Sequence, residues 1–518
     1  MQLNLTNIHY TYAGSAREVL SGVTLSLPQG WTGIVGDNGC GKSTLARIAA
    51  GMMAPTSGSV GPSALVGAYC EQDSSLSPEG LGDFACAWDR EAIGLRDQLG
   101  IDDDWPWRYD ELSCGQQKRL QVAVALWRHP DVLVMDEPTN HVDAPTRGRI
   151  LRALRGFDGI GLLVSHDREL LDELVLRCVS FEAGGVRLRP GNFSQAFKQH
   201  GMEVSAAAER RERARREERR LREERQRRVE EASRSRTLRS RRGLAPGDHD
   251  ARERIGRAIV SGKDGRATHL TKTLDARIRG ERDAADAAFV ERSYDGDVPE
   301  FGERSRRSVV AHVPAGVVPF AGERGGAPGG GASATGEAPL ACAGVRVPEL
   351  FLGSGDHVGL VGPNGTGKST LVRELVRAVL GDVPMVYVPQ ELSAEDAARV
   401  VGRLRELTAG ERGRVLSVVA QLNSRPEAIL DGGMPSPGEL RKLVLAEAAL
   451  LSPQLLVMDE PANHLDLHSV QALERMLAGF PGAVVLVSHD ARMVNAVCGR
   501  VWELVPDSDG GGSVLRER

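Results

Sequence analysis

One ordered set of short motifs occurs twice in this 518-residue chain. Each copy runs from a glycine-rich loop through a glutamine and a serine-glycine motif to an acidic strand end and a histidine. The first copy comprises Gly36–Ser43, Gln72, Leu112–Gln116, Val132–Glu137 and His166. The second comprises Gly362–Ser369, Gln390, Ser436–Glu439, Leu455–Glu460 and His489. A single glycine-rich loop is a weak signal, but the same order in both halves predicts two related domains.

Each glycine-rich loop stands between an apolar strand and a helix, as phosphate-binding loops do. Backbone N–H groups and the dipole of the following helix would hold the phosphates of ATP. Lys42 and Lys368 would reach the β- and γ-phosphates, while the Ser43 and Ser369 hydroxyls would ligate Mg²⁺. The predicted nucleotide contacts are Gly36, Asn38, Gly39, Gly41, Lys42, Ser43 and Thr44 in the first loop, and Gly362, Asn364, Gly365, Gly367, Lys368, Ser369 and Thr370 in the second.

Acidic residues follow an apolar run in each half. Asp136 and Asp459 end runs typical of buried parallel strands, which would place their carboxylates beside the metal ion. Glu137 and Glu460 come next and would polarise the attacking water.

Matched polar residues complete each set. Gln72 and Gln390 occupy the same place in the two repeats, which favours contact with metal and water over a plain strand-end glutamine. His166 and His489 each follow a third apolar strand, and their pairing favours a γ-phosphate contact over a structural role.

The serine-glycine motifs fit the start of helices. Ser113 and Ser436 are typical N-caps, so each motif would offer a hydroxyl, free amides and a helix dipole to a γ-phosphate. The remaining contacts predicted there are Gly115, Gln116, Gly438 and Glu439. Pro435 stands where the first copy has Leu112, which predicts slower turnover at the site that uses the second motif.

An aromatic residue precedes each loop. In ABC ATPases, which the motifs above resemble, an aromatic residue at this place often stacks on adenine, and the resemblance implies that role for Tyr12. Phe320 repeats its position, although a core or turn role for Phe320 has equal weight.

These motifs resemble those of the ABC-F subfamily of ABC ATPases. Both Asp-Glu-Pro stretches continue in the manner of that subfamily, as Thr139–Asp143 and Ala462–Asp466. The resemblance implies two α/β P-loop domains paired head to tail within one chain, and a monomer is expected. Each ATP would lie between the P-loop of one domain and the signature motif of the other. Lys42 would then face Ser436, and Lys368 would face Ser113.

Composition excludes other classes. The apolar runs fall far short of the roughly 18 residues of a membrane span, and Met1–Leu5 lacks the features of a signal peptide, so a cytoplasmic protein is expected. Seven cysteines without a CxxC pair favour neither disulfides nor a zinc site. For Cys40 and Cys114 within the motifs, a small loop-filling role is favoured over a redox switch.

A charged segment separates the repeats. The net charge of −5 hides 16 Arg and 8 Glu between Glu209 and Arg242. We predict domain 1 at 1–198, a linker at 199–305 and domain 2 at 306–518, with a flexible glycine-rich insertion at 325–336.

The linker carries two narrow apolar stripes. The stripes comprise Ala214, Leu221, Val229 and Ala232, then Leu270, Leu274, Ile278, Ala285 and Phe289. They predict a long antiparallel helical hairpin whose first helix spans Ser205–Arg242. Its tip, at about 239–265, is rich in glycine and arginine. The surplus of arginine suits RNA phosphates, although a merely solvated helix face is also open.

In ABC-F proteins the corresponding linker enters the tRNA exit region of the ribosome. The resemblance thus implies rRNA, and P-site tRNA, as partners of residues 199–305. Only 40 residues separate Gln72 from Ser113, 45 separate Gln390 from Ser436, and 29 follow His489. The two spacings leave little room for an additional helical arm, and the last length leaves none for a C-terminal coiled coil. In having a long linker without an arm, the chain most resembles the antibiotic-resistance ribosome-protection members.

Other functions remain open. One is a general ABC-F translation factor, and another is the ATPase subunit of an antibiotic exporter with a separate membrane partner. A DNA-bound structural ATPase is disfavoured because no long coiled coil separates P-loop from signature within a half. The chain also has no N-terminal cysteine cluster of the kind an iron-sulfur recycling factor carries.

Overall fold

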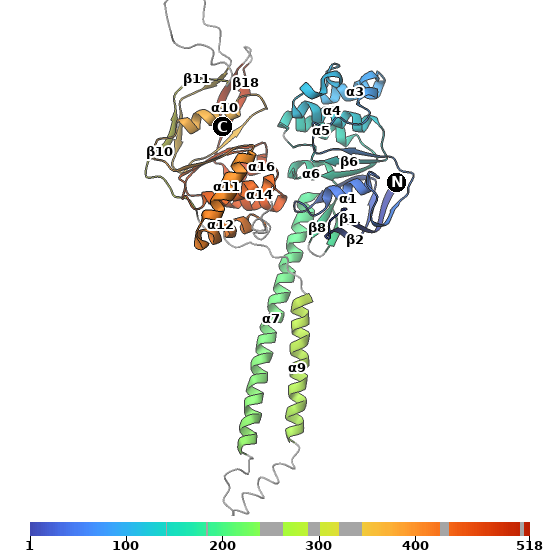
Figure 1. Cartoon of the computed structure of the whole chain (residues 1–518), viewed down its shortest axis with the longest axis vertical. Helices are drawn as coiled ribbons and strands as arrows, with labels where there is room; N and C mark the ends of the chain where they lie inside the picture. The colour runs from blue at the N-terminus through green and yellow to red at the C-terminus, as the bar shows by residue number, and fades with distance from the viewer. Residues whose placement is uncertain are drawn as a thin grey trace, which may run out of the picture. The chain divides into compact units, whose positions relative to one another are not determined.

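The computed structural model describes residues 1–140, 142–182, 185–238, 263–287, 301–320, 344–424, 435–507 and 512–518. The chain divides into two compact units, one made of Met1–Ser194 with Ser293–Arg518 and the other of Gln195–Arg292. The first unit holds two α/β domains, here called domain 1 (up to Ser194) and domain 2 (from Phe301) (Figure 1). The glycine-rich insertion at 325–336 and most of the predicted tip, 239–262, lie outside the described residues.

Domain 1 is built on a six-stranded sheet of order β5-β6-β7-β3-β8-β9, in which only β9 is antiparallel to its neighbour. A three-stranded antiparallel sheet, β2-β1-β4, shares an apolar core with helix α1 and this sheet. The strands are β1 (Gln2–Thr11), β2 (Glu18–Pro28), β3 (Gly30–Val35), β4 (Ser57–Gly61), β5 (Gly67–Cys70), β6 (Val132–Asp136), β7 (Ile160–Val164), β8 (Arg177–Glu182) and β9 (Gly185–Pro190). The helices are α1 (Lys42–Ala49), α2 (Leu81–Cys86), α3 (Arg90–Leu99), the 3₁₀ helix η1 (Trp105–Glu111), α4 (Cys114–Trp127), α5 (Ala144–Arg155) and α6 (Arg168–Leu174).

Domain 2 repeats the plan on an eight-stranded sheet of order β11-β12-β19-β18-β14-β17-β16-β15, with a two-stranded sheet β10-β13. The strands are β10 (Val309–Val313), β11 (Gly316–Pro319), β12 (Gly344–Val347), β13 (Leu350–Gly353), β14 (His357–Val361), β15 (Met385–Val388), β16 (Leu455–Asp459), β17 (Ala483–Val487), β18 (Arg500–Pro506) and β19 (Ser513–Glu517). The helices are α10 (Lys368–Arg377), α11 (Ala394–Glu406), α12 (Ala409–Gln421), α14 (Pro437–Ala448), α15 (Leu467–Ala478) and α16 (Ala491–Val497).

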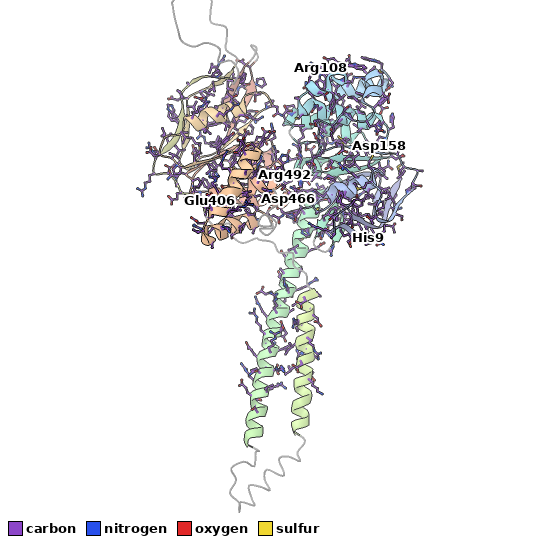
Figure 2. All side chains as sticks on the ribbon, in the orientation of Figure 1. His9, Arg108, Asp158, Glu406, Asp466 and Arg492 are labelled. Atoms are coloured by element: carbon purple, nitrogen blue, oxygen red, sulfur yellow. The ribbon has the colours of Figure 1, made fainter. Side chains whose placement is uncertain are left out.

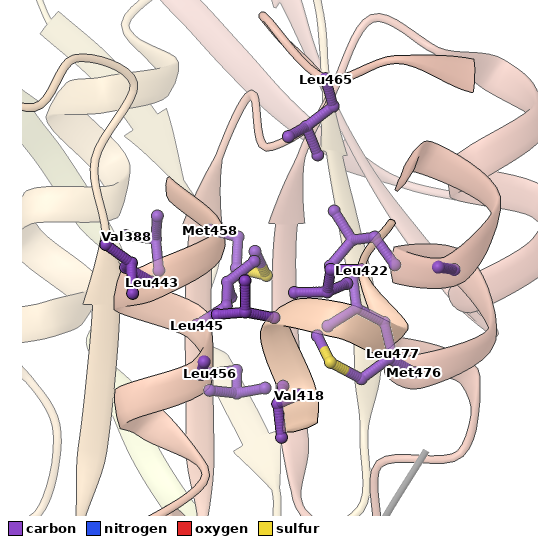
Figure 3. Packing of buried hydrophobic residues seen from close by; sticks show 14 of the residues in the cluster. Val388, Val418, Leu422, Leu443, Leu445, Leu456, Met458, Leu465, Met476 and Leu477 are labelled. Carbon is purple, nitrogen blue, oxygen red and sulfur yellow. The ribbon is translucent and has the colours of Figure 1, made fainter. Parts of the chain in front are cut away.

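The apolar runs of the sequence become buried central strands. Every residue of β6, β7, β16 and β17 is buried. Parallel strands covered on both faces lose the alternation of apolar and polar residues, which is why these runs are continuous. In domain 2, Leu443 and Leu445 of α14 lie in one cluster with Leu456 and Met458 of β16 (Figure 3).

The second unit is a pair of helices, here called the hairpin, formed by α7 (Phe193–Leu238) and α9 (Lys263–Ala287) (Figure 1). Arg225 of α7 lies 2.6 Å from Asp275 of α9, and Glu217 lies 3.7 Å from Arg277. Partners fall along α9 as they rise along α7, so the helices are antiparallel, as predicted. None of the helices in the described ranges is both long and apolar enough to cross a bilayer.

Part of the predicted apolar stripe is buried. Ala214, Leu221, Leu274 and Ala285 are buried. The assignment of Val229 to the stripe is wrong, because its side chain is 40% exposed. Eight residues of helix turn by about 80° beyond two full turns, which carries Val229 away from the face of Leu221. The side chains of Leu270, Phe289 and Ala232 lie outside the described residues.

The first helix of the hairpin begins at Phe193, before the predicted start at Ser205. Asp172 explains the difference, because its carboxylate accepts hydrogen bonds from the Ser194 N–H (2.7 Å) and from the Ser194 hydroxyl at the start of the helix. At its far side the helical unit ends at Arg292, whereas the linker was predicted to reach residue 305. Phe301 packs against Phe480 in the core of domain 2, with ring centroids 5.3 Å apart.

Replacing Leu221 by Ala should destabilise the hairpin by roughly 2–5 kcal/mol, because this side chain is 1% exposed and its loss leaves a cavity. Hydrogen exchange of the full chain should then quicken in α7 and α9. Val229→Ala is the matched control and should change little. Equal exchange in both variants would contradict the apolar seam.

Candidate active site

The order of the strands brings the predicted residues to one edge of each sheet. In domain 1, β3 lies between β7 and β8, and β6 lies beyond β7. The carboxyl ends of parallel strands meet at one edge, so the P-loop after β3, Glu137 after β6 and His166 after β7 converge there. In domain 2, β14, β16 and β17 do the same for the second P-loop, Glu460 and His489.

Each P-loop ends in a left-handed glycine that starts a helix. Gly41 has φ 107° and Gly367 has φ 89°, and no side chain caps α1 or α10 in the described structure. A Cβ on Gly41 would lie 2.9 Å from Val19, so a larger residue would distort the loop. The first N–H groups of both helices suit an anion such as a phosphate.

The P-loop lysines lie against their own loops. Lys42 Nζ donates to the carbonyls of Gly36 (2.8 Å) and Asp37 (2.9 Å), and Lys368 Nζ does so to Gly362 (2.8 Å). Each lysine therefore lies along the loop that precedes its own helix. Burial raises the pKa of the Cys40 thiol in the first loop, which agrees with a loop-filling role. None of the six cysteines in the described ranges is in a disulfide.

Glu137 and Glu460 are held in a left-handed backbone conformation, with φ 49° and 46°. Their N–H groups donate to the last residues of the neighbouring strands, Val164 and Val487, at 2.8 and 2.9 Å. Such backbone strain persists where surrounding contacts fix it, and it is common at functional sites.

In both glutamates, only one of the two carboxylate oxygens accepts a hydrogen bond among the described residues. One oxygen of Glu137 accepts the His166 N–H at 3.2 Å, and one of Glu460 accepts the His489 N–H at 3.3 Å. The other oxygen of each is buried without a hydrogen bond among the described residues. Burial, with help from Asp136, raises the pKa of Glu137 to about 8, and burial raises that of Glu460 to about 7. A carboxylate with such a pKa is suited to accept a proton from water.

The two histidines lie beside the glutamates. Nε2 of His166 lies 3.5 Å from Glu137, and Nε2 of His489 lies 3.6 Å from Glu460 and 3.2 Å from Lys368 Nζ. Burial, followed by the charge of the neighbouring lysine, lowers their pKa values to about 3 and about 4. Both imidazoles are therefore neutral near pH 7 and can donate one hydrogen bond without adding charge.

The predicted magnesium ligands fit that ion. Ser43, Gln72 and Asp136 line one cavity with Lys42, and the Ser369 hydroxyl donates to Asp459 at 3.2 Å in domain 2. Mg²⁺ prefers oxygen ligands such as these. They would hold Mg²⁺, which neutralises charge on the phosphates of ATP. The hydroxyl of Tyr69 also donates to Asp136 and fixes its carboxylate.

Two composite sites join the domains. Site one is a cavity of about 520 Å³ lined by Lys42, Glu137, Ser436 and Gly438, which is the expected pairing. Tyr12 lines it too, with its hydroxyl 2.8 Å from that of Thr44. The cavity also contains Asn38, Gly39, Gly41 and His166.

Site two is divided. A cavity of about 440 Å³ is lined by Lys368, Glu460 and Phe320, and it also contains Asn364, Gly365, Gly367, Ser369, Thr370, Gln390, Asp459 and His489. Ser113 lines an adjacent cavity of about 910 Å³ with Gly115 and Gln116. The two cavities share Asn364 and Gln390. At site one, the signature of domain 2 and the P-loop of domain 1 therefore line the same cavity. At site two, the signature of domain 1 lines a cavity next to the one that contains the P-loop of domain 2.

Ser113 and Ser436 are the N-caps of α4 and α14, as predicted. The Ser113 hydroxyl donates to the Gln116 amide oxygen at 2.9 Å, and the Ser436 hydroxyl donates to the Glu439 carboxylate at 2.7 Å. Site one thus has a carboxylate where site two has a neutral amide. Gln116 lines the site-two cavity together with Ser113, whereas Glu439 is bonded to Ser436 but does not itself line the site-one cavity.

Basic residues of the signature helices were missed by sequence reasoning. Lys118 Nζ donates to the carbonyl of Gln72 at 3.2 Å, and Arg441 donates to those of Glu460 (2.7 Å) and Gln390. They position the residues predicted to bind metal and water. The sequence did contain a clue to them: a basic residue follows the serine of the signature motif at the same distance in both halves.

Fold and site together define a tandem P-loop ATPase, and comparisons with known proteins specify it further. A family model described as ABC transporter matches residues 20–140 and 347–463. The ATP-binding protein Uup of Caulobacter vibrioides is 30% identical over 97% of this chain and 77% of its own length. The tylosin resistance ATP-binding protein TlrC of Streptomyces fradiae is 30% identical, with 97% of each chain covered. The ribosome protection protein VmlR of Bacillus subtilis is 27% identical over 94% of this chain and 84% of its own.

A solved structure titled RNase-L Inhibitor has a TM-score of 0.60 at 18% identity, covering 98% of this chain and 89% of that one, and it supports the fold. The chain belongs to the ABC-F subfamily of ABC ATPases and hydrolyses ATP.

Changing Glu137 and Glu460 together to Gln should leave ATP binding intact and lower turnover by roughly 10²–10⁴-fold, because the amide cannot accept a proton. Among single variants, Glu460→Gln leaves only site one active and should show the lower residual rate. Steady-state hydrolysis and nucleotide binding measure both effects. Turnover near that of the unaltered protein in the double variant would remove the glutamates from this role, and equal single rates would contradict unequal sites.

Turnover at saturating ATP and Mg²⁺ should rise from about pH 6 to about pH 9. The reason is that carboxyls with raised pKa values, about 8 for Glu137 and about 7 for Glu460, must lose their proton to act as bases. The histidines stay neutral over this range. A flat or falling profile would contradict the assignment, and the double Gln variant is the control.

Proposed function

We propose that this ATPase binds the ribosome through its hairpin and uses ATP binding and hydrolysis to displace ribosome-targeting antibiotics. The observation that carries the proposal is the exposed, arginine-rich face of α7. A ribosomal partner would place the protein in the cytoplasm.

The arginines of α7 are available to an external anion. Arg213, Arg216 and Arg220 have side chains that are 73%, 73% and 74% exposed. Each pairs with a glutamate three or four residues away, but exposed pairs of this kind contribute little. With 16 Arg against 8 Glu between 209 and 242, the segment keeps a surplus of positive charge. Such a surplus suits the phosphates of rRNA and tRNA, which need no base-specific contacts.

The relatives support this partner and this role. TlrC is named for tylosin resistance and VmlR for ribosome protection, and the alignments with both span more than nine-tenths of this chain. No arm separates β5 from the first signature in the described structure, where only α2, α3 and η1 intervene. A general ABC-F translation factor is the alternative, and drug susceptibility distinguishes the two.

A chain of contacts could carry the ATPase cycle toward the hairpin. Asp172 binds the start of α7 through Ser194, and the same carboxylate accepts a hydrogen bond at 2.6 Å from Arg492 of domain 2, which is labelled in Figure 2. Arg492 stands in the first turn of α16, three residues after His489. A shift of α16 during the ATPase cycle would therefore reach the first turn of α7.

Changing Arg213, Arg216 and Arg220 to Gln should weaken ribosome binding and flatten its dependence on salt by roughly two in the logarithmic slope, because fewer counterions are released. Co-sedimentation with ribosomes across a salt series measures this. The matched control changes three exposed arginines of domain 1, Arg108, Arg152 and Arg155. An unchanged slope in the α7 variant, or co-sedimentation with membranes instead, would contradict the proposal.

Replacing residues 239–262 by a short Gly-Ser turn distinguishes drug displacement from mere binding. The replaced segment joins the two helices and contains six arginines. Both ATP sites should keep their turnover, while drug resistance of expressing cells should be lost. Undiminished resistance would mean that the segment is only a connector.

A further inference from the structure

Asp37 and His468 form a contact between the two ATPase domains that the motifs do not account for. Asp37 is the second residue of the first P-loop, and His468 lies in the first turn of α15. Nδ1 of His468 lies 3.2 Å from Oδ1 of Asp37. Asn423, just after α12, donates from Nδ2 to the same oxygen at 2.9 Å. Two side chains of domain 2 thus hold one carboxylate of the P-loop of domain 1.

The residues of domain 2 that contact Asp37 are held in place by other residues of domain 2. Asp466, buried as the N-cap of α15 (Figure 2), accepts hydrogen bonds from Ser469 N–H at 2.8 Å and from Asn423 at 3.3 Å. Lys442 lies 3.5 Å from the same carboxylate and is itself buried. These contacts fix Asn423 between Asp37 and Asp466.

Asp37 is also tied to the phosphate-binding lysine. Its backbone carbonyl accepts a hydrogen bond from Lys42 at 2.9 Å, while its side chain reaches across to domain 2. A displacement of the Asp37 side chain therefore moves the Asp37 carbonyl group, which holds Lys42. The contact links closure of the domains to the geometry of the P-loop.

The equivalent contact cannot form at site two. Alignment of the P-loops places Pro363 opposite Asp37, and alignment of the segments after Asp-Glu-Pro places Pro145 opposite His468. Proline has neither charge nor a side-chain hydrogen-bonding group. By contrast, both P-loop asparagines contact the opposite domain, since Asn38 donates to the His464 carbonyl at 2.8 Å and the Asn364 N–H donates to Asp143 at 3.2 Å. The asparagine contacts are common to the two sites, and the carboxylate-imidazole contact belongs to site one.

We propose that Asp37 and His468 are positioning residues that hold site one closed, so that nucleotide leaves site one more slowly than site two. The contact does not touch the reacting atoms. It acts by keeping the P-loop of domain 1 against the signature of domain 2. The inference does not depend on the ribosome as partner.

The test uses the full chain with Glu137→Gln and Glu460→Gln, which should bind ATP without hydrolysing it. Release of fluorescently labelled ATP into an excess of unlabelled ATP should show a slow and a fast phase. Lys42→Ala, which removes phosphate binding at site one, identifies the phase that belongs to that site. In the unaltered contact, site one should provide the slow phase.

Asp37→Asn and His468→Gln should each speed the slow phase by about two- to fivefold, as expected for a partly exposed side-chain contact to a carboxylate. The two changes together should add little to either alone, because they remove the same contact. Exchanging the residues, with Asp37→His and His468→Asp, should restore slow release.

Transfer of the contact to site two is the matched gain-of-function variant. Pro363→Asp with Pro145→His should slow the fast phase. One common release rate for both sites, fully additive effects of the two single changes, or no rescue by the exchange would each overturn the proposal. Ribosome binding plays no part in these measurements, so their failure would leave the proposed function to its own tests.

Discussion

The composite ATP sites of this chain require its two domains to meet, and a buried arginine, Arg168, joins them. Arg168 of domain 1 donates to Glu474 of α15 at 3.0 Å and to Asp490 at 2.9 Å. Asp490 directly follows His489 and caps α16 through the N–H groups of Arg492 and Met493. Loss of one partner of a buried pair costs roughly 3–5 kcal/mol, because a charge is left unpaired. The contact that joins the domains therefore also fixes the helix that follows the histidine of site two.

The sequence predicted local backbone features within each domain, and the resemblance implied the pairing of each P-loop with the signature of the other domain, but the side chains that join the domains were not predicted. P-loops, the glutamates after the strands and the N-caps depend on local backbone geometry, so their residues could be named from spacing alone. Arg168 and Asp37 could not be named, because their partners are decided by which surfaces meet after folding. The position equivalent to Arg168 in domain 2 is Ala491. Because Arg168 is not repeated, comparison of the two halves, which identified the motifs, could not identify this residue.

In the hairpin, too, the features set by local sequence were predictable, whereas those set by tertiary contacts were not. Periodicity predicted two antiparallel helices, since apolar residues recur on one face. It misplaced the start of α7, because that start is fixed by a hydrogen bond from Ser194 to Asp172 of domain 1 and not by the periodicity of the charged segment. Helical periodicity also assigned Val229 to the apolar seam. The helix turns by about 80° beyond two full turns between Leu221 and Val229, so Val229 lies off that face.

The two ATP sites are built from the same motifs but differ in charge, cavity and contact across the domains. Site one combines a signature carrying Glu439 with a P-loop held by His468, whereas site two has Gln116 and prolines at the corresponding places. Ser436, which lines site one, is bonded to the Glu439 carboxylate, while the contact of Asp37 with His468 joins the two domains at the same site. Site two, without that contact, is the better placed to open and close in each cycle, and it is site two whose histidine precedes the helix bound to Asp172 at the start of α7.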